Sequence, residues 1–262
     1  MKKSLWVAGL LLLLVSQAHA EIFDVKNIPD YEKFSLRFIY KGVELASPPQ
    51  KPFVMRYIAA ESSVDAVYIT RMVGEGAERH LEVEIKGKAF NGYRITHFYR
   101  YRPGSKLILG SYEKNVFSPS GKKIRSEFYD FSESSPPLPN NLTHPYTFPL
   151  ALRGMTFTIG REETFYIWFN PTTVFAAVLK VKGEEEITVP AGKFKCYRIE
   201  IGPDLVDFVG PVVGRALKPF IASYIAWLDT KPPHRIVRYQ GPFGMVNIAG
   251  PSEIYELVKV GG

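Results

Sequence analysis

The side chains that could do chemistry are few and scattered along the chain. Beyond residue 20 the sequence has four histidines, His80, His97, His144 and His234, and none belongs to an i, i+4 pair or an HExxH zinc motif. Cys196 is the only cysteine, which excludes a CxxC motif and an intramolecular disulfide. The sequence contains no G-x-S-x-G nucleophile elbow. We therefore expect no metal site, no cofactor and no catalytic site.

Other polar patterns leave alternatives open. A dispersed nucleophilic triad remains possible in principle, because triads assemble in space rather than in sequence. The three acids at 184–186 are interpreted as a solvated rim in preference to an acid/base or metal site. The stripe of Arg94, Arg100 and Arg102 could bind anionic headgroups or polysaccharide, but a solvated strand face is the favoured interpretation. Cys196 alternates with strand residues and is predicted to fill the core.

The stretch "EEEITVPAGKFKCYRIEIG" (184–202) shows which elements must position these residues. From Lys193 onward its side chains alternate with period two, which is typical of a half-buried strand. Pro190 lacks an N–H group and Gly192 tolerates positive φ, so the two residues indicate a turn. The pattern predicts a β-hairpin corner rather than a phosphate-binding loop, which would need more glycines and a Lys-Ser or Lys-Thr pair.

Most of the remaining chain also has strand periodicity. Short alternating segments are separated by Gly, Pro, Asn or Asp clusters, which favours an antiparallel sandwich or barrel. The 15 Tyr and 18 Phe fit strand-rich packing. Beside the hairpin, strands are expected at 34–40, 64–73, 80–87, 93–102, 106–114, 122–131, 163–169, 173–183, 224–229, 235–240 and 252–260.

Three segments depart from this pattern. The proline-rich stretch at 134–141 is expected to be an exposed connector that divides an N-terminal from a C-terminal half. A short helical turn is expected at 148–153. Residues 203–222 have apolar residues at spacings of three and four, with Pro211 able to start a helix and Pro219 to end it. This spacing predicts a broken amphipathic helix inserted between two strands.

The N-terminus indicates export. Lys2 and Lys3 precede the apolar run "LWVAGLLLLLV", and "SQAHA" ends in the small-x-small pattern of a signal-peptidase site. We expect residues 1–20 to be a signal peptide cleaved after Ala20, and residues 21–262 to be one β-rich periplasmic domain. Its halves at 21–135 and 142–262 are expected to share one sheet. Without Lys2 and Lys3 the formal charge falls from +7 to +5, which suits a protein near anionic lipid or polysaccharide. The compartment argues against nucleic acid.

The C-terminal half resembles a known family in the order of its motifs. "LALRG" is followed by "VKGEEEITVPAGKFKCYRIEI", then "AWLDTKPPHRIVRYQ" and "SEIYELV". Over about residues 148–260 this order resembles the domain-of-unknown-function family 3108 of secreted Gram-negative proteins. The resemblance implies an antiparallel, partly open barrel, distantly like the lipoprotein-localisation carriers whose curved sheet holds acyl chains under helices. It also implies that Pro190, Ala191, Gly192 and Phe194 form a corner and that Trp227 is a core or cavity wall.

The expected fold is therefore mainly β: an antiparallel, partly open barrel or strongly curved sheet with a short helical insertion acting as a lid. A curved sheet under an apolar lid can bury a long ligand, which favours a non-catalytic periplasmic carrier of a lipid or other apolar envelope ligand, with peripheral membrane contact possible. The alternatives are an envelope assembly factor without ligand and an enzyme acting on envelope polymers. Oligomeric state is not predicted. The expected cavity and lid residues are Leu205, Val209, Val213, Leu217, Phe220, Trp168 and Trp227.

Overall fold

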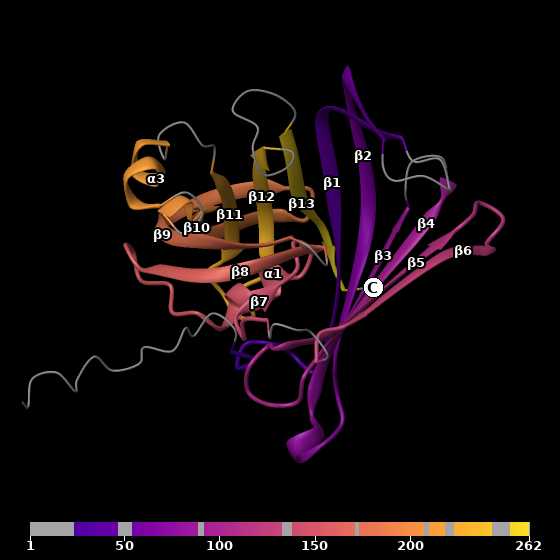
Figure 1. Ribbon diagram of the computed structural model, residues 1–262, viewed down its shortest axis with the longest axis horizontal. Coiled ribbons are helices and arrows are strands. Elements are labelled where there is room, and N and C mark those ends of the chain that lie inside the picture. The colour runs from indigo at the N-terminus through magenta and orange to yellow at the C-terminus, as the bar shows by residue number, and fades with distance from the viewer. Residues whose placement is uncertain are drawn as a thin grey trace, which may run out of the picture.

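One large sheet organises the protein. The computed structural model describes residues 24–46, 54–88, 92–132, 138–170, 173–206, 210–217, 223–242 and 252–261. The expected signal peptide and residues 134–137 of the proline-rich connector lie outside the described residues. The sheet has 13 strands in the order β6-β5-β4-β3-β2-β1-β13-β12-β11-β10-β9-β8-β7. All described pairs are antiparallel except β7 with β8. Figure 1 shows the sheet strongly curved but not closed, which confirms the expected fold class.

The sheet is built from two runs of consecutive strands. The N-terminal run contains β1 (Tyr31–Ala46), β2 (Val54–Val73), β3 (His80–Lys88), β4 (Arg94–Tyr101), β5 (Leu109–Phe117) and β6 (Lys123–Asp130), with the 3-10 turn η1 (Gly76–Glu78) between β2 and β3. The C-terminal run contains β7 (Leu142–Thr143), β8 (Glu162–Asn170), β9 (Thr173–Val189), β10 (Gly192–Pro203), β11 (Tyr224–Asp229), β12 (Ile236–Pro242) and β13 (Ser252–Val260). The described helices are α1 (Phe148–Ala151), η3 (Leu152–Gly154) and α3 (Pro211–Leu217).

The predicted alternation decides which face of each strand is buried. In β3, Leu81, Val83 and Ile85 are all at most 3% exposed, whereas the residues between them are half-buried. The hairpin corner is also confirmed: β9 and β10 are joined by the turn at Pro190, and Gly192 has φ 132° opposite Val189. The period-two pattern therefore predicted both the strands and the core-facing side correctly.

The two runs meet at β1 and β13, which pair in the middle of the sheet. Phe38 of β1 lies opposite Tyr255 of β13, and Leu36 lies opposite Leu257. Phe38 and Tyr255 also pack ring against ring, with centroids 4.3 Å apart. The N-terminal and C-terminal strands of the described chain therefore hold the two runs together.

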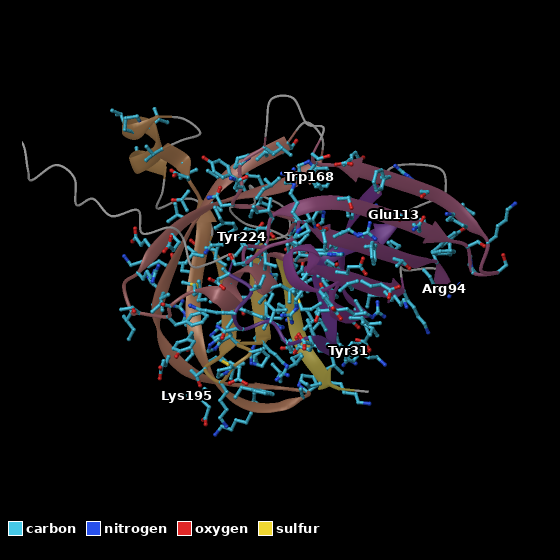
Figure 2. The ribbon with its side chains drawn as sticks, turned by 90° about the horizontal axis from the view of Figure 1, so that it is seen from below. Tyr31, Arg94, Glu113, Trp168, Lys195 and Tyr224 are labelled. Atoms are coloured by element: carbon cyan, nitrogen blue, oxygen red, sulfur yellow. The ribbon has the colours of Figure 1, made fainter. Side chains whose placement is uncertain are left out.

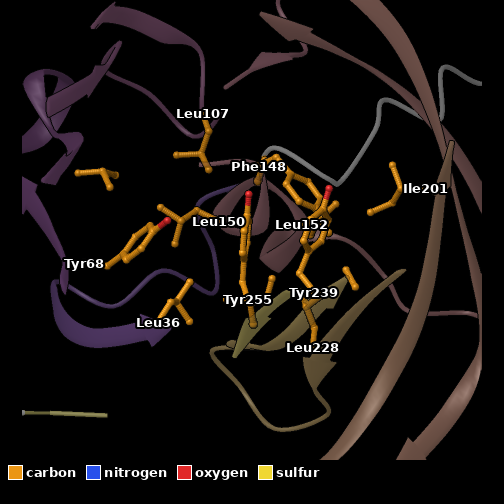
Figure 3. Packing of buried hydrophobic residues seen from close by; sticks show 14 of the residues in the cluster. Leu36, Tyr68, Leu107, Phe148, Leu150, Leu152, Ile201, Leu228, Tyr239 and Tyr255 are labelled. Carbon is orange, nitrogen blue, oxygen red and sulfur yellow. The ribbon is translucent and has the colours of Figure 1, made fainter. Parts of the chain in front are cut away.

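A short buried segment, α1 followed by η3, fills the space between the two runs. The expected helical turn at 148–153 is confirmed, and every residue from 148 to 154 is buried. In Figure 3, Leu150 and Leu152 lie between Leu36 and Tyr68 of the N-terminal run and Tyr239 of the C-terminal run. The chain thus uses this segment as a plug that gives both runs a common core.

A buried ion pair fixes the plug. The guanidinium of Arg153, which is 1% exposed, bonds to the carboxylate of Glu32 on β1, and Arg235 bonds to the other oxygen of the same carboxylate. Asn27 donates a hydrogen bond to the backbone oxygen of Arg153 at 2.6 Å. Burial lowers the pKa of Arg153, and the charge of Glu32 acts against that shift. Removing the carboxylate would leave a buried cation without its counterion.

Candidate functional site

A small hollow lies on the inner side of the C-terminal run, beside α1. Its volume is about 60 Å³, and its walls are almost wholly aliphatic or aromatic. Apolar walls with few polar groups are typical of small-molecule sites, in which those groups orient the ligand. The lining residues are Pro145, Phe148, Phe165, Ile167, Phe175, Ala177, Ile201, Gly202, Pro203, Tyr224, Tyr239, Glu253 and Tyr255.

A row of stacked tyrosines forms one wall of the hollow. Tyr224 of β11 stacks on Tyr239 of β12 with ring centroids 5.4 Å apart, and Tyr239 stacks on Tyr255 of β13 at 5.0 Å. Figure 3 shows the side chains of Tyr239 and Tyr255 pointing the same way from neighbouring strands. Burial is the largest cause that raises the pKa of all three phenols above the usual range, so they are neutral at physiological pH.

Gly241 sets the position of Tyr224. A Cβ atom on Gly241 would lie 2.0 Å from Cδ1 of Tyr224, closer than two carbon atoms can approach. The Tyr224 ring therefore lies directly over the backbone of β12, and only glycine leaves room for it there. The absence of a side chain at Gly241 therefore allows the Tyr224 ring to form a flat wall of the hollow.

Glu253 is the only ionisable group other than tyrosine among the lining residues. It shares the inner face of β13 with Tyr255 and lies opposite Tyr40 of β1 and Gly241 of β12. Burial raises the pKa of Glu253 from 4.5 to about 7, and a hydrogen bond with Tyr255 acts in the opposite direction. Within the described residues no Lys, Arg or His lies within ion-pair distance of its carboxylate.

A second cluster of buried polar groups lies on the inner side of the N-terminal run. The hydroxyl of Tyr112 is 3.0 Å from Nδ1 of His97. Nδ1 of His144 accepts a hydrogen bond from the Tyr146 backbone N–H at 3.3 Å and lies 3.0 Å from the hydroxyl of Tyr99. We call His97, Tyr99, Tyr112, His144 and Trp168 the aromatic cluster.

Both histidines of the aromatic cluster are neutral at physiological pH. Burial, with a smaller contribution from the charge of Lys114, lowers the pKa of His97 to about 3. Burial also lowers the pKa of His144 well below its usual value. Because their imidazoles already have hydrogen-bond partners inside the fold, these histidines fit a structural role better than acid/base catalysis.

The two tryptophans expected at the cavity lie elsewhere. Trp168 belongs to the aromatic cluster, with its ring centroid 5.6 Å from Tyr112 and 5.8 Å from His144. Trp227 points to the face of β11 opposite Tyr224, where its indole N–H donates to Glu185 and the Arg238 guanidinium lies 5.8 Å from its ring. Neither tryptophan lines the hollow, although both are buried.

The expected lid residues lie beyond the end of β10. Leu205 is half-buried just after Pro203, which lines the hollow. In α3, Val212 is 81% exposed and Val213 is 49% exposed. Figure 2 shows this helix projecting from the body of the protein. A helical insertion is therefore present, but the described part of α3 does not line the hollow; Val209, Phe220 and the side chain of Leu217 lie outside the described parts.

The other polar patterns singled out from the sequence are engaged within the fold. Arg100 pairs with Glu82 at 3.1 Å, and Arg102 donates to the backbone oxygen of Phe131 at 3.3 Å. Glu184 and Glu186 pair with Lys195 and Lys193 across the β9–β10 hairpin. Burial raises the pKa of the Cys196 thiol to about 12, so the thiol is protonated. Among the described residues, no group of three or more His, Cys, Asp or Glu could hold a metal ion.

No protein-family model matches the chain, and no curated protein matches it. The resemblance to domain-of-unknown-function family 3108 therefore stays a prediction. Solved structures with a similar fold include a β-barrel-like protein of domain of unknown function DUF1849 from Brucella abortus, with 9% identity over 88% of this chain and 96% of that one and a TM-score of 0.46. A DUF1329 family protein from Desulfovibrio piger has 9% identity over 89% and 86% of the two chains and a TM-score of 0.35.

A third similar structure is a putative exported protein with a YmcC-like fold from Bacteroides fragilis, with 13% identity over 92% of this chain and 99% of that one and a TM-score of 0.31. These proteins are described by a domain of unknown function or by fold alone. Among the described residues, no helix is both long enough and apolar enough to cross a bilayer.

Proposed function

We propose that this protein is an exported, non-catalytic binding protein of the periplasm that carries an apolar ligand. The ligand that we propose first is the acyl chain of a lipid. The observation that supports this is the hollow beside α1, whose walls are apolar apart from one carboxyl group. Burial of a hydrocarbon chain against such walls is favourable by about 0.8 kcal/mol per CH₂ group. An open, curved sheet leaves a route into the hollow that a closed core would not.

The size of the hollow says how a chain would bind. Its 60 Å³ is about four to six times the ~10–15 Å³ that a cavity needs on the same measure to hold one water. A long chain would therefore place only its end in the hollow and extend outward past Gly202 and Pro203, which lie at its wall. In that direction the ligand would reach the helical insertion, and in the proposed complex it would contact Leu205 and Val213.

Filling the hollow tests this function. Ala177 lines the hollow, so Ala177→Leu should occupy the space and weaken binding of a fluorescent long-chain fatty alcohol about tenfold or more. Ala176→Leu is the matched control, because Ala176 is also buried but points to the other face of β9. Fluorescence titration measures both affinities. Equal affinities for the two variants, or no binding by the unaltered protein, would contradict the proposal.

A further inference from the structure

Glu253 gives the hollow a chemical preference that its apolar walls alone would not have. A carboxylate taken out of water is costly unless a cation or several hydrogen-bond donors compensate it. Within the described residues Glu253 has no cationic partner, and its hydrogen bond is with the neutral phenol of Tyr255. Among the described residues, the hollow therefore has an acid at its wall without a counterion.

The titratable groups that Glu253 influences among the described residues are neutral phenols. Its charge contributes to the raised pKa of Tyr40, Tyr146, Tyr224, Tyr239 and Tyr255, in each of which burial is the largest cause. These phenols come from β1, β11, β12, β13 and the segment before α1, and Tyr255 is the one that hydrogen-bonds to the carboxyl group. Phenol oxygens can accept hydrogen bonds, and an ammonium group offers three donors.

We infer that the hollow selects an apolar ligand that carries a protonated amine, with Glu253 as the counterion and neighbouring tyrosine oxygens as further acceptors. This inference rests on the proposed function, since it names the ligand class of the same hollow. An alcohol would gain the apolar contacts but not the charge pairing. A carboxylate ligand would place two like charges together in an apolar setting, which is unfavourable.

Three probes of equal chain length separate these possibilities: dodecylamine, dodecanol and dodecanoate, each titrated calorimetrically at about pH 8. We expect dodecylamine to bind about tenfold or more tightly than dodecanol, and dodecanoate to bind most weakly. Glu253→Gln should remove the preference for the amine, so that the ratio of dodecylamine affinity to dodecanol affinity falls to about one. Glu256→Gln is the matched control, because Glu256 lies on the opposite face of β13 and pairs with Arg238 at 3.6 Å; it should keep the preference.

The pH dependence on the unaltered protein gives a second test that needs no variant. The amine favours ionised Glu253, so its affinity should rise as pH increases from about 5.5 to 8, approaching tenfold per pH unit below pH 7, while dodecanol affinity stays constant. Equal binding of amine and alcohol at pH 8, or tighter binding of dodecanoate, would overturn the amine inference and leave the carrier function standing. If none of the three compounds binds, both proposals fail.

Discussion

The aromatic cluster and the hollow treat buried ionisable groups in opposite ways, although both lie on the inner side of one sheet. In the aromatic cluster, His97 and His144 have hydrogen-bond partners supplied by neighbouring tyrosines and backbone. In the hollow, Glu253 has a tyrosine contact but no basic partner among the described residues. The difference teaches that burial alone does not mark a functional group: buried polar groups are ordinarily satisfied within the fold, and one beside unfilled space lacking its counterion is the informative case.

The largest effect on stability is expected at the buried ion pair beside the plug, where a buried charge has its partners within the fold. Glu32→Gln removes the carboxylate that pairs with both Arg153 and Arg235, and should lower the free energy of unfolding by about 3–5 kcal/mol. Urea denaturation followed by circular dichroism measures the loss. Asp30→Asn is the control, because the Asp30–Arg79 pair is solvent-exposed and should cost no more than about 1 kcal/mol. A similar loss for the two variants would show that burial does not decide these energies.

The opposite pKa shifts predict opposite pH profiles for the two regions. Glu253 has a pKa of about 7 in the folded protein against 4.5 ordinarily, so the folded state binds more protons between these values and stability is lost as pH rises through that window. The free energy of unfolding of Glu253→Gln should therefore increase relative to that of the unaltered protein as pH rises from 5 to 8, by up to about 3 kcal/mol.

His97 has the reverse sign, because its pKa falls from 6.5 to about 3 on folding. The unfolded state binds the proton first, so stability is lost as pH falls below 6.5. In the unaltered protein this loss of stability amounts to about 2 kcal/mol at pH 5, and His97→Asn should abolish it. Above pH 7 the variant and the unaltered protein should depend on pH in the same way. Denaturant midpoints at pH 5, 6.5 and 8 compare both variants with the unaltered protein. Parallel profiles for the two variants would contradict the assignment of opposite signs.

The wall of the hollow can be tested through Gly241. Gly241→Ala brings a Cβ atom into the space of the Tyr224 ring and should destabilise the protein by about 1–3 kcal/mol, because the ring or the strand must move. Adding Tyr224→Ala should reduce that cost, which a double-mutant cycle measures as a coupling energy. Gly183→Ala is the control, since no atom lies within 4 Å of its added Cβ. Additive effects at Gly241 and Tyr224 would show that the ring does not depend on the glycine.

The smallest expected effect concerns α3. Val212 is 81% exposed, so Val212→Asp should change the free energy of unfolding by no more than about 0.5 kcal/mol. Its effect on retention of the fluorescent fatty alcohol is the informative measurement. Retention unchanged alongside unchanged stability would remove this valine from the proposed route of the ligand, whereas weakened retention would place α3 on it.

Local patterns in the sequence predicted much of the fold. The alternation of Leu81, Val83 and Ile85, the turn at Gly192 and the short helix at 148–153 are all local signals, and the structure confirms them. The role of that helix as a buried plug could not be predicted, because Arg153 and Arg235 reach Glu32 across 121 and 203 residues of sequence. The periodicity of a single strand or helix does not indicate which residues so far apart in the sequence will be in contact.

The residues that line the hollow could be predicted from the sequence only in part. Tryptophan is the largest apolar side chain, and both Trp168 and Trp227 were expected at the cavity, yet neither lines it. The residue that was missed, Glu253, had a usable signal: in "SEIYELV" it alternates in step with Tyr255 and Leu257, which are buried. A charged residue in phase with a buried apolar face indicates an inward carboxyl group. The hollow itself depends on the packing of six strands and α1, which local sequence patterns do not reveal.

The pairing of β1 with β13 has a consequence for how the chain folds. Strands at residues 31–46 and 252–260 must find each other before the centre of the sheet exists, whereas the outer strands β6 and β7 come from the middle of the sequence. Closing so long a loop has an entropic cost, and folds dominated by distant contacts form slowly. Until that closure, β1 and β13 are two unprotected edges that can pair with another chain. The seam that unites the finished sheet is therefore also the place where an incompletely folded chain can pair with a second chain.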